Sequence, residues 1–269
     1  MMIRSLLACL LFGVATASAE PAVTPGSKTL PLPGEAFQLG RHDAFVILPP
    51  KATEDIPWIW FAPTLRGLPA KSEVWMFKRF LAKGIAIAGI DVGESFGSPT
   101  GTDLYIAFYD HLVKKRQLHE KPCLLARSRG GLMLYSWAVE HPQSVGGVAG
   151  IYPVCNIASY PGVARAASAY GLTAKQLKDE LTKHNPIDRL KPLAEAGVPV
   201  FHIHGDSDKV VPLSLPKTRS ELVMTVHVDH ITAVCHDILE FSARALDAEL
   251  RGYTVARFPF ASSRERNTQ

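Results

Sequence analysis

The stretch LLARSRGGLML, Leu124–Leu134, places one serine between an apolar run and a glycine pair. The residues before Ser128 predict a buried strand, Cys123–Ala126, and those after it predict a helix, Gly130–Glu140. A strand that turns into a helix through a single residue crowds its neighbours, so only small side chains fit beside it. The pattern is A-x-S-x-G, in which Ala126 stands where the usual G-x-S-x-G motif has glycine. We interpret Ser128 as a nucleophile, with an ordinary turn serine as the alternative.

Outward from this turn, short apolar runs alternate with helical patterns. Strands that alternate with helices of this length indicate an α/β fold, in which helices cover both faces of a mostly parallel sheet. At the C-terminal ends of such strands, side chains meet at one edge of the sheet, where a site is expected. The predicted strands are Ala44–Leu48, Trp58–Phe61, Ile85–Val92, Val145–Tyr152 and Val198–His204, and the predicted helices are Lys71–Lys83 and Leu104–Leu118.

The sequence divides into a leader, an arm, one domain and a tail. Residues 1–19 are typical of a signal peptide, because a positive start, a short apolar stretch and a small-x-small pattern follow one another. Residues 20–39, where Pro and Gly recur without periodicity, predict an extended arm. The domain covers 40–251, and residues 252–269 are predicted to be a disordered tail. Within the domain, 156–197 is a lid-like helical insertion between the sixth and seventh strands, or a surface decoration.

Composition narrows the classes of function. The chain has 269 residues, 47% of them hydrophobic, which suits one domain with a large core. The 29 Lys and Arg against 25 Asp and Glu give a net charge of +4 without a dense basic block, so no nucleic-acid partner is expected. The apolar stretch of the leader is too short to span a bilayer, so no stable membrane anchor is expected, with a lipid on Cys9 as the alternative. No spacing typical of a metal or phosphate site occurs, so no metal or cofactor is expected.

A second motif, HGDSDKVVP at 204–212, follows the strand that ends near Ile203. A serine nucleophile needs a base, and the base needs a carboxylate that fixes its tautomer. Asp208 lies in a tight loop at a strand end and suits this role. Asp206 is the competitor, although its place beside Gly205 is more typical of a turn cap.

Here the chain resembles the α/β-hydrolase superfamily, in the branch of secreted serine esterases and prolyl-oligopeptidase-like enzymes. The serine turn, the HGDSDKVVP stretch and the loop DVGESFGS at 91–98 carry the resemblance, the last with one spacing altered. It implies that Ser128 is the nucleophile, that Asp208 is the acid, and that the base follows the last strand. The base is His236 if Ile231–Cys235 is that strand, and His230 if Met224–Val228 is. No glycine precedes either histidine, which departs from the family pattern.

The resemblance also implies an oxyanion hole. The backbone N–H of Arg129 is one donor, and the second comes from Phe61 or Ala62 in the loop after the strand at 58–61. Trp60 and Arg127 are predicted to bind substrate. For Trp60 the alternative is a place in the core, and for Arg127 it is a pair with a surface carboxylate.

The predicted protein is a secreted or periplasmic serine hydrolase that cleaves carboxylic esters through an acyl-enzyme intermediate, without a cofactor. Its partner is a small-molecule or saccharide ester; the sequence makes no prediction of the oligomeric state. A prolyl-oligopeptidase-like serine peptidase and a catalytically inactive binding protein on the same fold are the alternatives. In an oxidising compartment Cys155 and Cys235 are the cysteine pair to test, and free thiols are the alternative.

Overall fold

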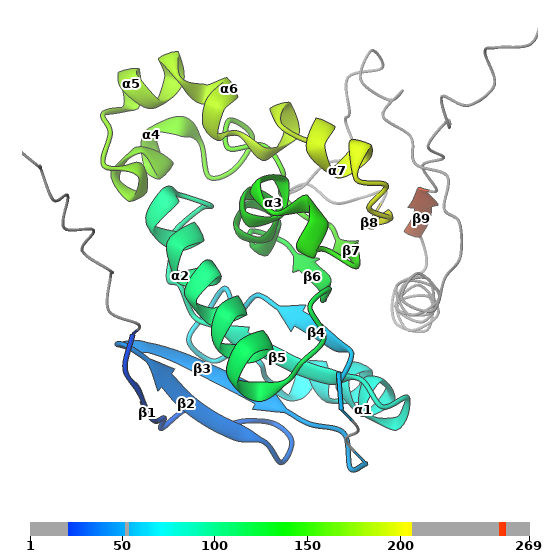
Figure 1. The fold of residues 1–269 in the computed structure, drawn as a ribbon. Helices are drawn as coiled ribbons and strands as arrows, with labels where there is room; N and C mark the ends of the chain where they lie inside the picture. The colour runs from blue at the N-terminus through cyan, green and yellow to red at the C-terminus, as the bar shows by residue number, and fades with distance from the viewer. Residues whose placement is uncertain (1–20, 52–53, 206–252, 257–269) are drawn as a thin grey trace, which may run out of the picture.

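A computed structural model describes residues 21–51, 54–205 and 253–256. In these residues nine strands form one sheet in the order β1-β2-β3-β5-β4-β6-β7-β8-β9 (Figure 1). The five strands β5, β4, β6, β7 and β8 are parallel, and antiparallel strands flank them at both ends of the sheet. The strands are β1 (Val23–Pro25), β2 (Glu35–Leu39), β3 (His42–Ile47), β4 (Trp58–Phe61), β5 (Ala86–Ile90), β6 (Cys123–Arg127), β7 (Gly147–Ile151), β8 (Val200–Gly205) and β9 (Tyr253–Ala256).

The predicted strands that lie within the described residues are present, with ends that differ by a few residues, whereas the last strand, predicted at 224–228 or 231–235, lies outside those residues. Every residue of β4, β5 and β7 is buried, as expected for strands that helices cover on both faces. These strands therefore read as continuous apolar runs in the sequence. The predicted fold class, a mostly parallel sheet between layers of helices, is confirmed.

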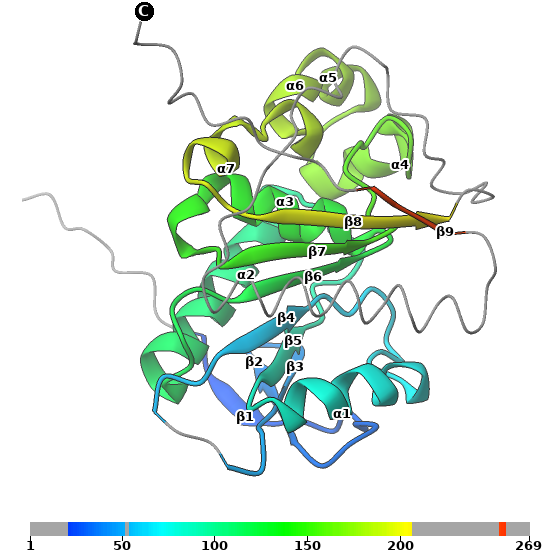
Figure 2. The same ribbon diagram turned by 90° about the vertical axis from the view of Figure 1, so that its right-hand side faces the viewer.

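Helices pack on both faces of the sheet and give two separate cores (Figure 2). On one face α1 (Val74–Ala82), which follows the 3₁₀ turn η1 (Lys71–Glu73), buries Phe77 and Phe80. On the other face lie α2 (Pro99–Asp110), its π-helical continuation η2 (His111–Lys115), and α3 (Gly130–Glu140), which is followed by the 3₁₀ turn η3 (Pro142–Ser144). Ten of the eleven residues of α3 are buried, so this helix is the centre of the larger core.

The connection between β7 and β8 is helical, as predicted. It packs through a third apolar cluster, in which Ile157 and Leu177 of the insertion lie with Leu132 of α3 and Phe96 of the loop after β5. The Tyr170 hydroxyl also donates to the carbonyl oxygen of Phe96 at 2.9 Å. The insertion comprises α4 (Val163–Ala166), η4 (Ala167–Tyr170), α5 (Ala174–Asp179), α6 (Leu181–His184), η5 (Pro186–Asp188) and α7 (Lys191–Glu195).

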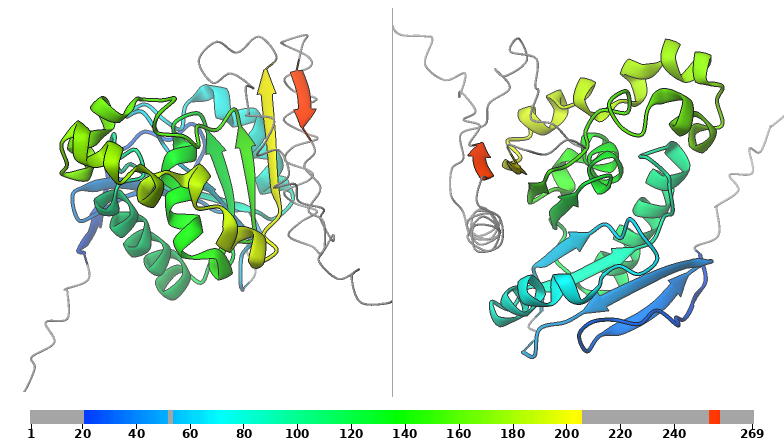
Figure 3. Two further views of the ribbon diagram at one scale, coloured as in Figure 1. Left: turned by 90° about the horizontal axis from the view of Figure 1, so that it is seen from above. Right: turned by 180° about the vertical axis from the view of Figure 1, so that it is seen from behind.

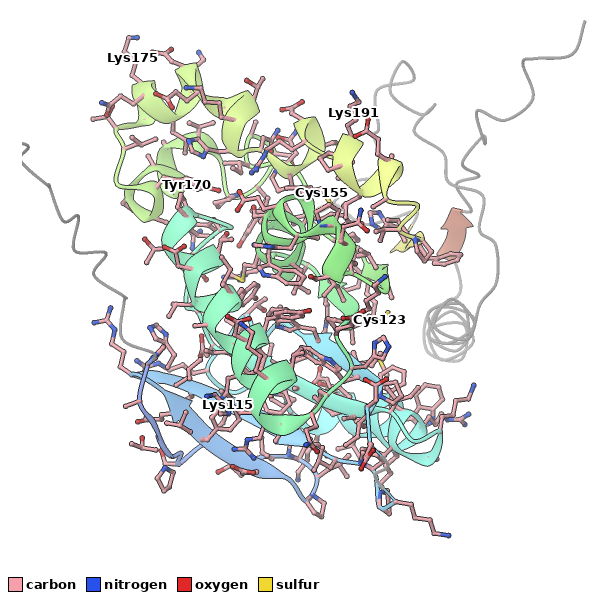
Figure 4. All side chains as sticks on the ribbon, viewed as in Figure 1. Lys115, Cys123, Cys155, Tyr170, Lys175 and Lys191 are labelled. Atoms are coloured by element: carbon pink, nitrogen blue, oxygen red, sulfur yellow. The ribbon has the colours of Figure 1, made fainter. Side chains whose placement is uncertain are left out.

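The outer face of the insertion is polar. Lys175 and Lys191 point away from the body of the molecule (Figure 4) and form exposed ion pairs with Asp179 and Glu195 one helical turn away. Such exposed pairs contribute little to stability. The apolar inner contacts therefore hold the insertion in place.

Two stretches differ from the prediction. Residues 20–39, predicted to be an arm, contribute β1 and β2 to the sheet. In β2 only Phe37 and Leu39 are buried, so the alternation of buried and more exposed residues covers just two buried positions. The surrounding sequence is rich in Pro and Gly, which hides this short pattern. Residues 252–269, predicted to be disordered, include β9, whose backbone pairs antiparallel with β8 (Figure 3, left). Strands β1 and β9 are the two edge strands and β2 is the next strand in from β1, and the apolar signal of these outer strands is weak.

The start of α2 also differs from the prediction. The helix begins at Pro99, before the predicted Leu104, because Ser98 is extended and Pro99 takes the first helical position.

Among the described residues, none of the helices has both the length and the apolar character that a membrane span requires. The leader at 1–19 lies outside the described residues.

Gly89 in β5 should not tolerate a side chain. A Cβ there would lie 2.3 Å from the carbonyl oxygen of Phe61 and 2.8 Å from the ring of Phe45. We expect Gly89→Ala to lower the free energy of unfolding by about 2 kcal/mol, measured by urea denaturation. Gly67→Ala is the control, because its Cβ would meet no atom within 4 Å. Equal losses for the two variants would contradict the packing described for β4 and β5.

Candidate active site

Ser128 is the single residue that turns the chain from β6 into α3. Its φ is 50°, in the left-handed region, where a residue with a Cβ pays about 1 kcal/mol or more. Backbone hydrogen bonds hold it there: its N–H donates to Ile151 at 3.1 Å, and its carbonyl oxygen accepts from Gly131 and Val154, each at 2.9 Å. The side chain is half-buried. Both β7 and α3 therefore fix the serine in a strained conformation at the C-terminal edge of the sheet.

The residues around Ser128 are small because the backbone of neighbouring segments passes close to them. A Cβ on Gly131 would lie 2.4 Å from the carbonyl oxygen of Val154, and one on Gly130 would lie 3.2 Å from the Cβ of Ala62. Ala126 is fully buried. The crowding that the motif implies is thus present on both sides of the turn.

The two candidates for the second oxyanion donor are placed differently. Ala62 is the residue whose Cβ lies next to Gly130, so it borders the serine turn directly. Phe61 is still within β4, opposite Leu125 of β6, and its ring packs edge-on against Phe77 at 5.6 Å between centroids. The structure therefore brings Ala62 to the turn, while the Phe61 side chain belongs to the core.

Trp60 lies in the core and has no exposed surface. Its ring packs against those of Trp58, Tyr105 and Trp137, with centroids 4.8 to 5.4 Å apart. A side chain in this position cannot contact a substrate. Trp60 therefore belongs to the core, which was the alternative, and not to the wall of a substrate pocket.

Arg127 pairs with a buried carboxylate and not with a surface one. Its Nη1 donates to Glu73 at 2.6 Å, and its Nε donates to the Tyr152 hydroxyl at 3.1 Å. Glu73 is only 2% exposed. Burial acts to lower the pKa of Arg127, but the contacts with Tyr152 and Glu73 outweigh it and raise that pKa. The contacts with Tyr152 and Glu73 therefore favour the charged form of the guanidinium.

Arg129, on the other side of Ser128, is held by two further segments. Its guanidinium is bonded to Glu94 in the loop after β5 and lies over the ring of Tyr160, 5.8 Å from the centroid. Tyr160 belongs to the insertion. The loop at 91–98 is itself shaped by Gly97, whose φ is 79° and where a Cβ would lie 2.4 Å from the carbonyl oxygen of Leu132.

The other predicted site residues, Asp208, Asp206, His236 and His230, lie outside the described residues. Their roles stay predictions. Among the residues that the structure describes, no group of three or more His, Cys, Asp or Glu side chains is placed to hold a metal ion. The described arrangement around Ser128 thus comprises the serine turn, one candidate oxyanion loop and two arginines that are each bonded to a carboxylate.

Three polar neighbours of the site were not predicted: Glu73, Glu94 and Tyr152. Glu73 stands in the first turn of a predicted helix, where a carboxylate is ordinarily exposed and stabilised by the helix N-terminus. Its partner Arg127 is 54 residues further along the chain. Of the three, only Glu94 could have been found from the sequence, because it lies in the loop at 91–98 that carries part of the family resemblance.

The Cys155 thiol is close to the backbone of the segment after β7. It donates a weak hydrogen bond to the carbonyl oxygen of Pro153, and burial raises its pKa to about 12. Cys235 lies outside the described residues. The Cys155–Cys235 pair therefore stays a prediction.

Solved structures of similar shape come from several bacteria. Est1E from Butyrivibrio proteoclasticus aligns with a TM-score of 0.55 at 16% identity, over 80% of this chain and 99% of that one. An S-formylglutathione hydrolase from Agrobacterium tumefaciens aligns with a TM-score of 0.51 at 14% identity, over 86% of this chain and 98% of that one. MPT51 from Mycobacterium tuberculosis aligns with a TM-score of 0.50 at 14% identity, over 92% of this chain and 91% of that one.

At these identities the likeness shows the fold: the chain has the α/β-hydrolase fold. No protein-family model matches the sequence, and no curated protein matches it.

The strain at Ser128 can be measured by comparing two variants that both lack the hydroxyl. Glycine adopts a φ of 50° without a Cβ clash, so Ser128→Gly should be more stable than Ser128→Ala by about 1 kcal/mol in urea unfolding. At the exposed Ser168, in the ordinary 3₁₀ turn η4, the order should reverse, with glycine less stable than alanine by about 0.5 kcal/mol or more. The same order at both positions would show that Ser128 is not strained.

Proposed function

We propose that the protein is an exported serine hydrolase that cleaves carboxylic esters. The observation that carries the proposal is Ser128 itself: a half-buried serine, held at a φ of 50° between β6 and the N-terminus of α3. Strained backbone persists where the surrounding structure fixes it, and it is common at active sites. The α/β-hydrolase fold supports the same reading, because in this fold the nucleophile occupies such a turn.

The proposed reaction begins when the Ser128 hydroxyl attacks the acyl carbon of the ester. His236, or His230 as the alternative, takes the proton, and Asp208 orients the imidazole and stabilises its cation. Backbone N–H groups of Arg129 and of Ala62 or Phe61 hold the oxyanion, each worth about 3 kcal/mol. The alcohol leaves with the proton from the base. Water, activated by the same base, then releases the acid and restores the serine.

Export is part of the proposal and rests on the first 19 residues. The N-terminal residue of the mature chain, expected near Glu20, tests it. The substrate class, a small-molecule or saccharide ester, also belongs to the proposal. Est1E has been solved with ferulic acid bound, so a panel of acetyl esters, acetylated sugars, aryl-acid esters and peptidyl amides separates the ester hydrolase from the peptidase alternative.

A fluorophosphonate probe tests the nucleophile. The purified wild type should acquire one label, because an activated serine attacks phosphorus, and Ser128→Ala should acquire none; intact mass spectrometry measures both. Ser159→Ala is the control, since that exposed hydroxyl only donates to the carbonyl oxygen of Asn156. An unlabelled wild type would favour the catalytically inactive binding protein instead.

Histidine and aspartate variants test the rest of the triad. We expect His236→Ala and Asp208→Asn each to lower kcat/KM for p-nitrophenyl acetate by about 10³-fold to 10⁴-fold, because the serine then lacks a base in the correct tautomer. Asp206→Asn should leave kcat/KM within about twofold, as expected for a turn residue. If His230→Ala carries the large loss and His236→Ala does not, His230 is the base.

A further inference from the structure

Two segments meet at the carboxylate of Glu73: the stretch 70–73 and the end of β6. Its oxygens accept from the backbone N–H of Ala70 at 2.6 Å, from the Ser72 hydroxyl at 2.9 Å and from Arg127 at 2.6 Å. Arg127 is the last residue of β6 and directly precedes Ser128. This ion pair, whose carboxylate is buried, thus joins the serine turn to the far end of the loop 62–70, and the first residue of that loop, Ala62, lies next to Gly130.

The second contact of Arg127 reaches the segment after β7. Its Nε donates to the hydroxyl of Tyr152, which directly follows Ile151, the residue that accepts the N–H of Ser128. Tyr152 has a φ of 37°, so it too is held in the left-handed region. One guanidinium therefore links η1 (which directly follows the loop 62–70), the end of β6 and the start of the loop after β7.

The loop 62–70 itself is tied down at its middle. The Leu68 N–H donates to the carbonyl oxygen of Leu65 at 3.0 Å, and the Leu68 side chain packs against the core on the α1 face. A constraint at Ala70 is therefore transmitted along a short, folded loop rather than along a free chain. At its other end the loop carries the N–H proposed to hold the oxyanion.

We propose that Glu73 and Arg127 are positioning residues for the oxyanion hole, a role that rests on the proposed function. The pair fixes the separation between the N–H of Arg129 and the N–H of Ala62, without contact with the substrate. Two nitrogens of Arg127 are already engaged, which distinguishes this role from the substrate-binding one predicted from the sequence. Burying the Glu73 carboxylate costs desolvation that an apolar side chain avoids, so we assign the pair to fixing geometry rather than to stability.

Steady-state kinetics with p-nitrophenyl acetate provide the first test. Glu73→Gln and Arg127→Met should lower kcat by about 10-fold to 100-fold while KM changes less than about twofold, because a misplaced donor weakens only the binding of the transition state. Arg127→Lys, which keeps the charge and one donor, should recover part of the loss.

A matched control separates this effect from a loss of stability. Arg116 and Glu35 form a bidentate pair, at 2.6 and 2.7 Å, between η2 and β2. Arg116→Met and Glu35→Gln should keep kcat within about twofold at 25 °C, and the thermal midpoint of every variant is measured beside its kcat. A similar fall in kcat for both pairs would overturn the proposal.

Amide hydrogen exchange supplies a readout that needs no catalysis. In Glu73→Gln, exchange of peptides over 62–70 and 127–131 should become at least about fivefold faster, and in Glu35→Gln it should not change. Unchanged exchange in the folded variants overturns the proposal, whatever their activity. If the wild type proves inactive, the proposed function fails, and exchange alone still decides whether the pair holds the loop.

Tyr152→Phe covers the case in which the charge variants do not fold. It removes one hydrogen bond and leaves the ion pair intact, so kcat should fall by about threefold, with faster exchange at 127–131. If the charge variants do not fold and Tyr152→Phe keeps the wild-type kcat and the wild-type exchange rate at 127–131, the pair serves stability alone. That result would overturn the proposal.

Discussion

The backbone of Ser128 is the constraint on which the rest of this structure depends. A residue with a Cβ avoids a φ of 50°, and here the hydrogen bonds to Ile151, Gly131 and Val154 impose it. Those bonds require β7 to lie directly beside β6 and α3 to begin within two residues of the serine. The order of the parallel strands and the run of small residues around the turn both follow from this requirement.

The two cores on the faces of the sheet make the turn rigid. On one face α3 is buried along nearly its whole length, and on the other the rings of Phe61 and Phe77 lock α1 onto β4. The elements on either side of the serine cannot move independently, because close-packed interiors transmit displacement rather than absorb it. Polar contacts add to this at the rim, where each arginine beside Ser128 is bound to a carboxylate from another segment.

The parts of the fold that the sequence predicts are those buried on both sides. Strands β4, β5 and β7 and helix α3 are visible as apolar runs, and the serine turn follows from small residues between two of them. Strand β2, the second from one edge of the sheet, was missed because only Phe37 and Leu39 are buried in it. The partner of Arg127 was missed because an ion pair over 54 residues leaves no local pattern, and Trp60 looks alike in sequence whether it lines a pocket or fills a core.

The insertion is attached to the C-terminal edge of the sheet through the loop after β5 and the start of α3. Tyr170 satisfies the carbonyl oxygen of Phe96, a residue whose own φ is 50°, and the apolar residues of the insertion cover Leu132 at the start of α3. The segment is for this reason not an exchangeable module. A different insertion grafted onto this scaffold would have to supply its own donor for Phe96 and its own cover for Leu132, which limits how freely this part of the chain can be exchanged.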